Sequence, residues 1–337
     1  MLVDFRQLEK KEIDADLCIV GAGAAGITLA RVFTGTGIRV CLLESGGFEY
    51  DARIQELYSG EDTGFHEPYG LAGSRLRYFG GTTNHWVGRC APLAKMDFEV
   101  RPWLPHSGWP IRKADLDPYY EAAQTLCEVG PYRYDLSDFP ERFRQAPPFA
   151  GDKVLMRVWR LSPPTRFGAR YRRDLEQAGN VHVYLHANVT ELEASRDTSR
   201  VNVARLRTLD GQTGRVRAKY FVLACGGIEN ARLLLLSNRV ASRGLGNGND
   251  LVGRFYMDHP KMEGAAIALV EDDHPFKTMV GDFRKDSVKL ETMLCASEES
   301  QRREQTLNWA AQFSLAPESR EWAAALRDIR DSWQAGR

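Results

Sequence analysis

The fold is decided by Asp16-Leu-Cys-Ile-Val-Gly21-Ala-Gly23-Ala-Ala-Gly26, together with the apolar run Val40-Cys-Leu-Leu-Glu44 that follows it. A buried strand delivers Gly21 to a tight turn, Gly23 lets the backbone approach a pyrophosphate, and Gly26 lets the next helix pack closely. Glu44 follows at about the expected 20-residue spacing, where a carboxylate accepts ribose hydroxyls and repels the 2′-phosphate of NADP. A purely structural strand-turn-helix is the alternative. The order of strand, turn, helix, strand and terminal acid favours a dinucleotide site.

Composition narrows the class of protein. The 337 residues are 43% hydrophobic, enough to fill the cores of two domains around a cleft. Lys and Arg number 45, as do Asp and Glu, and this balance argues against nucleic acid as the main partner. The six cysteines are scattered without a CxxC pair, so neither a metal cluster nor a disulfide framework is expected. Cys18 and Cys41 fall inside predicted core strands and are interpreted as small apolar fillers.

The sequence also predicts a location. The first twelve residues are charged and lack the apolar core of a signal peptide. No run of about 20 apolar residues is present, so no membrane span is expected. We therefore expect a cytoplasmic protein.

Further along the chain, patterns predict other elements. Residues 58–92 are rich in Gly, Thr and aromatic residues and predict a long ordered loop. A helix is expected from Asp115, with an acidic cap and an early proline. Strand-like patterns at 181–192, 201–208 and 215–224 predict a three-stranded hairpin insertion. A strand over 307–315 and an amphipathic helix over 318–333 are expected near the end.

A second glycine turn comes late in the chain. The run Tyr220-Phe-Val-Leu-Ala-Cys225 meets Gly226-Gly227, and a helix is expected from Ile228 to Ser237. The order of strand, double glycine and helix indicates a second close approach of backbone to ligand. Packing alone also demands glycine at some strand-to-helix turns, and this alternative stays open.

Taken together, these blocks resemble the glucose-methanol-choline oxidoreductases, closest to the branch of pyranose oxidases and bacterial sugar dehydrogenases. The resemblance covers about residues 14–262 and rests on five blocks in the family's order. These are Gly21-Ala-Gly-Ala-Ala-Gly26 with Glu44-Ser-Gly-Gly, Arg77-Tyr-Phe-Gly-Gly-Thr-Thr-Asn-His-Trp86, Ser107-Gly-Trp-Pro-Ile with Asp115-Leu-Asp-Pro-Tyr-Tyr, Ala224-Cys-Gly-Gly-Ile-Glu-Asn-Ala-Arg-Leu-Leu-Leu, and Asn249-Asp-Leu-Val-Gly-Arg-Phe-Tyr-Met-Asp-His-Pro260.

The resemblance implies FAD as cofactor and oxidation of CH–OH groups of sugars or other alcohols. It assigns Gly21, Gly23 and Gly26 to the pyrophosphate and Glu44 to the adenosine ribose. It places Val189 where backbone meets the adenine edge. The remaining implied cofactor contacts are Arg77, Gly80, Gly81, Thr82, Asn84 and His85 in the loop against the flavin, and Gly226 and Gly227 at the second turn.

His85 carries a hypothesis of its own. In pyranose oxidases the aligned histidine is bonded covalently to the 8α carbon of the flavin, so His85 is a candidate for a covalent link. The alternative is a histidine hydrogen-bonded to loop backbone.

The catalytic base is not evident. The resemblance implies that a histidine in a C-terminal segment removes the hydroxyl proton while hydride passes to flavin N5, and we find no such segment. His259, in the Asp-His-Pro block, is the weak remaining candidate. A general base typically contributes a factor of about 10² to 10⁴ to the reaction rate. A chain that lacks the base could therefore still bind FAD while oxidising alcohols very slowly. We expect a truncated chain; the alternatives are a companion chain that supplies the missing segment and a substrate half built differently from the family's.

The predicted fold is α/β. A discontinuous Rossmann-like FAD-binding domain, with a parallel sheet, helices and a β-hairpin insertion, is expected over residues 1–115 and 180–260. An incomplete α+β substrate domain is expected over 116–179 and 261–337. Two alternatives to an active flavoenzyme remain: an NAD-dependent dehydrogenase, and a flavin-binding protein or subunit without its own base.

Overall fold

The computed structural model describes residues 1–63, 70–139, 152–258, 282–285 and 287–314. The chain divides into two compact units, Met1–Trp86 with Arg166–Lys261 (unit 1) and Val87–Thr165 with Met262–Arg337 (unit 2). The units change at 86/87 and 165/166, whereas the predicted domains change at 115/116 and 179/180. The assignment of a FAD-binding and a substrate domain to these parts stays a prediction.

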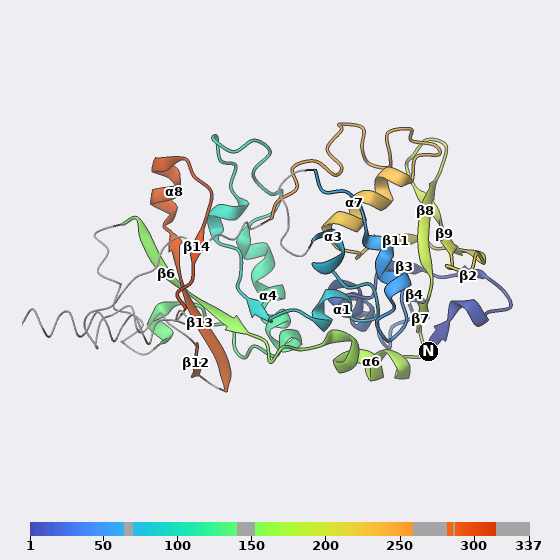
Figure 1. The fold of residues 1–337 in the computed structure, drawn as a ribbon, viewed down its shortest axis with the longest axis horizontal. Coiled ribbons are helices and arrows are strands. Elements are labelled where there is room, and N and C mark those ends of the chain that lie inside the picture. The colour runs from blue at the N-terminus through green and yellow to red at the C-terminus, as the bar shows by residue number, and fades with distance from the viewer. Residues whose placement is uncertain (64–69, 140–151, 259–281, 286, 315–337) are drawn as a thin grey trace, which may run out of the picture. The chain divides into compact units, whose positions relative to one another are not determined.

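Unit 1 is built on a five-stranded parallel sheet (Figure 1). In spatial order its strands are β1 (Leu2–Asp4), β7 (Val181–Leu185), β4 (Val40–Leu43), β3 (Leu17–Val20) and β11 (Tyr220–Leu223). Every residue of β3 and β4 is buried, as expected for strands covered on both faces. The predicted Rossmann-like α/β fold is confirmed.

The predicted hairpin insertion is partly wrong. The antiparallel part is β8 (Asn188–Ala194), β9 (Val201–Arg207) and β10 (Thr213–Arg217), and β2 (Glu12–Asp14) adds to it in parallel. The start of the first predicted strand is β7 and the end of the third is β11, and both lie in the parallel sheet. Burial explains the division: β7 is buried at four of five positions, whereas β9 alternates toward solvent.

Helices and short turns complete unit 1. They are η1 (Phe5–Gln7), α1 (Ala24–Val32), α2 (Ala52–Gln55), η2 (Glu56–Tyr58), α3 (Gly70–Gly73), η3 (Gly81–Asn84), α6 (Phe167–Gln177) and α7 (Gly227–Leu236). The apolar core joins side chains of both sheets, including Val20, Leu43, Leu206 and Val216. Cys18 and Cys41 lie opposite each other on the neighbouring strands β3 and β4. Both are buried in this core as predicted.

Unit 2 contains an antiparallel sheet in the order β12 (Asp282–Lys285), β13 (Val288–Ala296), β6 (Val154–Leu161) and β5 (Arg89–Cys90), with β14 (Ala310–Ala311) paired to β13. Its helical elements are η4 (Lys95–Phe98), α4 (Lys113–Cys127), η5 (Leu136–Asp138) and α8 (Glu298–Glu304). The predicted strand over 307–315 is reduced to β14. The helix predicted over 318–333 lies outside the described residues.

Helix α4 begins two residues before the predicted cap. Asp115 stands inside its first turn and accepts the Arg112 N–H at 2.8 Å, so it caps the helix from within. Pro118 therefore lies in the second turn and removes one backbone donor.

No helix in the described part of the chain is both long and apolar enough to cross a membrane. The cytoplasmic location stays a prediction.

Candidate functional site

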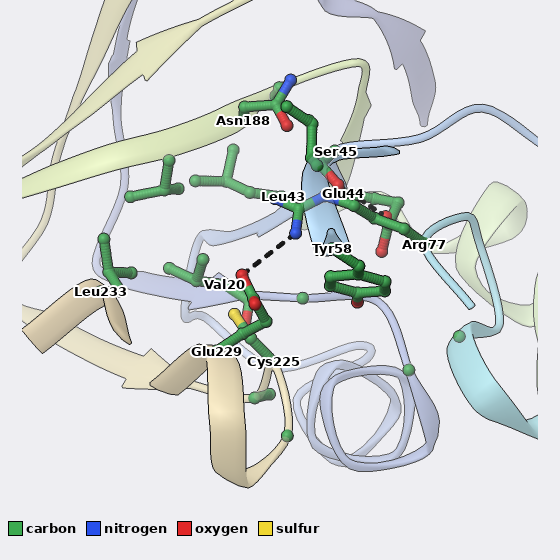
Figure 2. Close-up of a pocket in the computed structure, with 18 of the residues that line it drawn as sticks. Val20, Leu43, Glu44, Ser45, Tyr58, Arg77, Asn188, Cys225, Glu229 and Leu233 are labelled. Atoms are coloured by element: carbon green, nitrogen blue, oxygen red, sulfur yellow. Dashed lines mark hydrogen bonds and ion pairs between the residues drawn. The ribbon is translucent and has the colours of Figure 1, made fainter. Parts of the chain in front are cut away.

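A pocket of about 600 Å³ lies in unit 1 where β3, β4 and β11 end (Figure 2). The chain leaves β3 for β4 on one side, and β11 later pairs with the other side of β3. The strand order therefore reverses at β3, and parallel α/β sheets bind ligands at such a reversal. The wall contains the predicted cofactor residues Gly21, Gly23, Glu44, Arg77, Gly81, Thr82, Val189 and Gly226.

The first glycine turn connects β3 to α1 and is tightly packed. A Cβ on Gly21, whose φ is +100°, would lie 2.7 Å from the Ala224 carbonyl oxygen. A Cβ on Gly26 would lie 1.9 Å from the Gly21 carbonyl oxygen, so Gly26 supports the turn from outside the pocket wall. Gly23 differs, because the space where its Cβ would stand has no atom within 4 Å beyond Gly23 itself and its two chain neighbours. That open space faces the start of α1, whose free N–H groups favour an anion.

Glu44 ends β4 and is 6% exposed. Its Oε2 accepts the Ala22 N–H at 3.0 Å and its Oε1 accepts the Gly46 N–H at 3.0 Å. These bonds fix the carboxylate against the first turn. A carboxylate offers about four acceptor positions, so Oε2 keeps capacity for a ligand hydroxyl.

The predicted flavin loop lies directly against the first turn. The Gly80 N–H donates to the Ala22 carbonyl at 2.8 Å, and a Cβ on Gly81 would come within 3.0 Å of the Gly23 Cα. Arg166 fixes the same loop by donating to the carbonyls of Thr83 and Trp86 at 2.8 and 3.0 Å. Gly81 and Thr82 line the pocket, whereas Gly80 lies behind the wall.

Asn84 and His85 are outside the pocket wall. The Asn84 Nδ2 donates to the Phe79 carbonyl at 3.0 Å and so holds the loop closed. The His85 side chain is exposed.

The second glycine turn connects β11 to α7. Gly226 lines the pocket and has a φ of +84°, which favours glycine. A Cβ on Gly226 or Gly227 would meet no protein atom within 4 Å. Packing against the protein therefore does not require glycine at either position, which weakens the packing alternative. Gly227 is outside the pocket wall. The helix predicted over 228–237 is present as α7.

A buried ion-pair network joins α7 to Arg75 and Arg77, at the start of the loop predicted to lie against the flavin. The Glu229 carboxylate, 8% exposed, pairs with Arg75 at 3.0 Å. It also pairs with Arg77 at 3.1 Å (Figure 2). Arg232 pairs with the same carboxylate at 3.0 Å. Burial acts to raise the pKa of Glu229, but the hydrogen bond and charge of Arg232 and the charge of Arg77 outweigh it, so the pKa lies below its ordinary value. Glu229 is thus a fixed anion at the pocket edge.

Sequence reasoning missed this network, apart from Arg77. Glu229 lies two positions after Gly227. Its nearness to the second glycine turn, where a ligand was predicted, is the one sequence feature that could have marked it as a site residue. Tyr58 was also missed. It lines the pocket with the Arg75 guanidinium 4.0 Å from its ring centre, and burial raises the pKa of its phenol to about 12.

None of the histidines that the structure describes lines this pocket. His259, the weak candidate for the base, lies outside the described residues. The described part of the chain also contains no group of three or more His, Cys, Asp or Glu side chains arranged to hold a metal.

Comparison with known proteins identifies the family. Residues 16–336 match the family model of FAD-dependent oxidoreductases. The chain belongs to this family. FAD, rather than NAD, is therefore the cofactor that the family implies for this pocket.

Individual relatives of this FAD-dependent oxidoreductase are distant. It is 25% identical to the fructose dehydrogenase large subunit of Gluconobacter japonicus, over 75% of this chain and 60% of that protein. It is 28% identical to the 6'''-hydroxyparomomycin C oxidase of Streptomyces lividus, over 71% of this chain and 53% of that protein. The chain thus spans a little over half the length of these relatives.

Among solved structures, pyridoxine 4-oxidase from Mesorbium loti has a TM-score of 0.44 at 18% identity, over 66% of this chain and 51% of that chain.

The residues of the pocket fit FAD. Gly23 and Gly226 leave open space at two chain turns that face one pocket. Two buried polar atoms of the wall, Arg77 Nε and Asn188 Oδ1, have no hydrogen-bond partner in the described structure. Buried polar groups are nearly always hydrogen-bonded, so two side chains of the pocket wall each carry a polar atom without its usual partner.

Proposed function

We propose that this chain binds FAD in the unit 1 pocket and is the flavin-holding part of an enzyme that oxidises CH–OH groups of sugars or other alcohols. The observation that carries the proposal is the meeting of two open glycine positions, Gly23 in the first turn and Gly226 in the second, around one pocket with the Glu44 carboxylate. A dinucleotide needs backbone approach at its pyrophosphate and a fixed acceptor at its ribose, and these residues would supply both.

Each group has a distinct role in this proposal. The start of α1 and Gly23 receive the pyrophosphate, and Glu44 Oε2 accepts a ribose hydroxyl. Arg77 places a guanidinium, anchored by Glu229, at the pocket wall. When bound, FAD supplies the acceptor for a hydride from the carbinol carbon of the substrate.

The substrate class is proposed from two sources. One is the five-block resemblance to glucose-methanol-choline oxidoreductases. The other is the relatives' names: two are dehydrogenases, of fructose and of 2-methyl-1,2-propanediol, and one is an oxidase of 6'''-hydroxyparomomycin C. All of these names indicate hydroxyl-bearing substrates, so we propose a small polyhydroxylated or alcohol substrate.

The base is proposed to come from outside the described residues. His259 is one candidate, and a companion polypeptide is the other, in keeping with a relative that is itself named as a large subunit. Without a base the chain would hold FAD and reduce it slowly.

We further propose His85 as the attachment point of a covalent flavin, by its resemblance to the pyranose oxidase histidine. Its exposed side chain lies outside the pocket wall, so a change of rotamer would be needed to reach the ligand. Precipitation with trichloroacetic acid tests the link. Yellow colour in the pellet is expected, and its loss from the pellet of a His85→Ala variant ties the link to this residue. Colour in the supernatant alone rules it out.

The function is tested by the visible spectrum of the purified chain and by anaerobic addition of sugars and alcohols. We expect the bands of oxidised flavin, and bleaching with at least one substrate once the base is present. A flavin spectrum without bleaching would leave a FAD-binding subunit that needs a companion. A colourless protein that does not take up added FAD would overturn the proposal.

A further inference from the structure

Two cysteine side chains of unit 2, those of Cys90 and Cys127, are neighbours in the fold. Cys90 ends β5 and Cys127 ends α4, and both are half-buried free thiols. The two side chains share a hydrogen bond. Residues 91–126 separate them along the chain, so the tertiary fold brings the two sulfur atoms together.

The Tyr134 hydroxyl joins the two elements that carry these cysteines. It donates to the Cys90 carbonyl at 3.4 Å and accepts a hydrogen bond from Gln124 Nε2 at 3.0 Å. Gln124 lies three residues before Cys127, so their side chains share one face of α4. The face of α4 that carries Cys127 is therefore turned toward β5.

Residues 162–165 hold the same two elements through main-chain contacts. The Ser162 N–H donates to the Gly88 carbonyl at 2.7 Å, next to β5. The Thr165 Oγ1 donates to the Cys127 carbonyl at 3.3 Å, and the Thr165 N–H donates to Ser162 Oγ at 2.6 Å. The end of α4 and the start of β5 are thus fixed to one short segment. A disulfide requires the two sulfur atoms to approach to about 2.05 Å, and side chains already in contact need little backbone movement for this.

The shared hydrogen bond makes the two thiols unequal. It lowers the pKa of Cys127 below its ordinary value, although burial acts against this. The same bond, together with burial, raises the pKa of Cys90. Only the thiolate is nucleophilic, so Cys127 is the thiol that attacks first and Cys90 is the second partner.

We propose that Cys90 and Cys127 form a reversible disulfide that ties β5 to the end of α4 when a disulfide oxidant such as oxidised glutathione is present. In the first step the Cys127 thiolate attacks one sulfur of oxidised glutathione, the S–S bond of glutathione breaks, and one glutathione leaves as the thiolate. In the second step Cys90 loses its proton to solvent and attacks the Cys127 sulfur, and the second glutathione leaves. The two cysteines lose two electrons, and one oxidised glutathione becomes two reduced glutathiones.

The test uses the full chain, first reduced and then incubated with oxidised glutathione at pH 8. Remaining thiols are blocked with N-ethylmaleimide, and peptides are analysed by mass spectrometry without reduction. We expect a peptide pair linked through Cys90 and Cys127, which dithiothreitol separates. The linked chain should melt at least about 4 °C higher than the reduced chain, because a disulfide restricts the unfolded state.

Two variants separate the roles of the two thiols. Cys90→Ser should stop after the first step and accumulate a glutathione adduct on Cys127. Cys127→Ser leaves only the thiol with the raised pKa and should gain an adduct at least about tenfold more slowly. Far-ultraviolet circular dichroism of each variant shows that the reaction is measured on folded protein.

Other cysteines of the chain provide the controls. Cys18 and Cys41 are also neighbours, but they are 0% and 1% exposed and should stay reduced while the chain is folded. Cys295→Ala removes a further thiol of unit 2, in β13, and should leave the link between Cys90 and Cys127 unchanged.

The outcomes that would overturn the proposal are distinct. They are full alkylation of both thiols after oxidation, a stable glutathione adduct on Cys127 of the unchanged chain without a link, and a link from either thiol to another cysteine or another chain. A linked chain whose melting temperature is unchanged or lower would show that the fold must distort to form the bond, and this also overturns it. The reaction requires no flavin, so none of these results bears on the proposed FAD function.

Discussion

The two glycine turns of unit 1 follow neighbouring strands of one sheet, yet they need glycine for different reasons. In the first turn Gly21 and Gly26 each lie where a Cβ would strike backbone, at 2.7 and 1.9 Å. In the second turn a Cβ on Gly226 or Gly227 would meet no protein atom within 4 Å, and only the φ of +84° at Gly226 favours glycine. In the first turn Gly21 is closed in by the end of β11 and Gly26 by Gly21 itself, whereas both glycines of the second turn are open.

The two turns border the same pocket but differ in what supports them. The closed turn fixes α1 and, through Ala22, the Glu44 carboxylate and the Gly80 N–H. The second turn is also held from the α7 side, by the ion pairs of Glu229 to Arg75 and Arg77. Backbone packing therefore supports the first turn and the end of β11, and the ion pairs of Glu229 add a second support at the start of α7.

The largest expected effect comes from adding a methyl group to the closed turn. Gly26→Ala forces its Cβ to within 1.9 Å of the Gly21 carbonyl oxygen, so the turn must move. We expect a loss of roughly 3 kcal/mol of unfolding free energy, measured by urea denaturation. Gly23→Ala is the control, because its Cβ enters open space, and its stability should change by less than about 0.5 kcal/mol. Equal stability of the two variants would contradict the closed description.

The second-largest effect is expected from removing the negative charge of Glu229, which supports the second turn. Glu229→Gln leaves the guanidinium groups of Arg75 and Arg77, 15% and 11% exposed, without their anion. We expect a loss of about 2 kcal/mol near pH 7, because hydrogen bonds to charged groups contribute about that much. Asp250→Asn, which breaks a pair 57% exposed on both sides, should cost less than about 0.5 kcal/mol.

The same variant has a pH signature. The pKa of Glu229 is lowered by folding, so its ion pairs stabilise the fold above the unfolded pKa of about 4.3, and this contribution is lost as the pH falls through the folded pKa. The difference between the unchanged chain and Glu229→Gln should therefore be full at pH 7 and shrink below about pH 4. A difference that stays constant across that range would show that the carboxylate charge is not what holds the turn.

A smaller effect separates the two glycines of the open turn. Gly226→Ala places alanine at a φ of +84° and should cost about 1 to 2 kcal/mol of stability. Gly227→Ala meets neither strain nor contact and should leave stability unchanged or raise it by up to about 1 kcal/mol. If Gly227→Ala also leaves FAD affinity unchanged, as measured by fluorescence titration, Gly227 leaves the set of cofactor residues.

These turns also show what the sequence could predict. Glycine spacing and a terminal acid locate Gly21, Gly23 and Glu44, because backbone sterics tie those residue types to a strand-to-helix turn wherever they occur. The pocket wall does contain them. The Arg75, Arg77 and Glu229 network could not be predicted, since its members are about 150 residues apart and meet only through the tertiary fold.

The strands were predicted less well than the turns. The apolar pattern from 181 to 192 runs through both β7 and β8, and only the left-handed φ of 56° at His186 shows where one sheet ends and the other begins. Local hydrophobicity does not record which sheet a strand joins. The same limit applies to Asn188, whose sequence neighbours do not reveal that its oxygen is buried without a partner.

The smallest expected effect is on the alkylation rate of Cys225, at the start of the second turn. Cys225 stands between β11 and Gly226, and its Sγ donates to the Val20 carbonyl at 3.1 Å, toward the sheet. Burial raises the pKa of this thiol to about 12, so at pH 8 it is almost entirely protonated and unreactive, because only the thiolate is nucleophilic.

Cys127, in α4, is the internal reference, since its hydrogen bond with Cys90 lowers its pKa. Iodoacetamide at pH 8 should label Cys225 at least about tenfold more slowly than Cys127, as followed by peptide mass. Slow labelling with and without FAD means that the Cys225 thiol, although Cys225 lines the pocket, stays protonated and bonded to Val20. Rapid labelling that FAD blocks would mean that the whole turn is exposed to the pocket, and the contrast with the closed turn would extend to the end of β11.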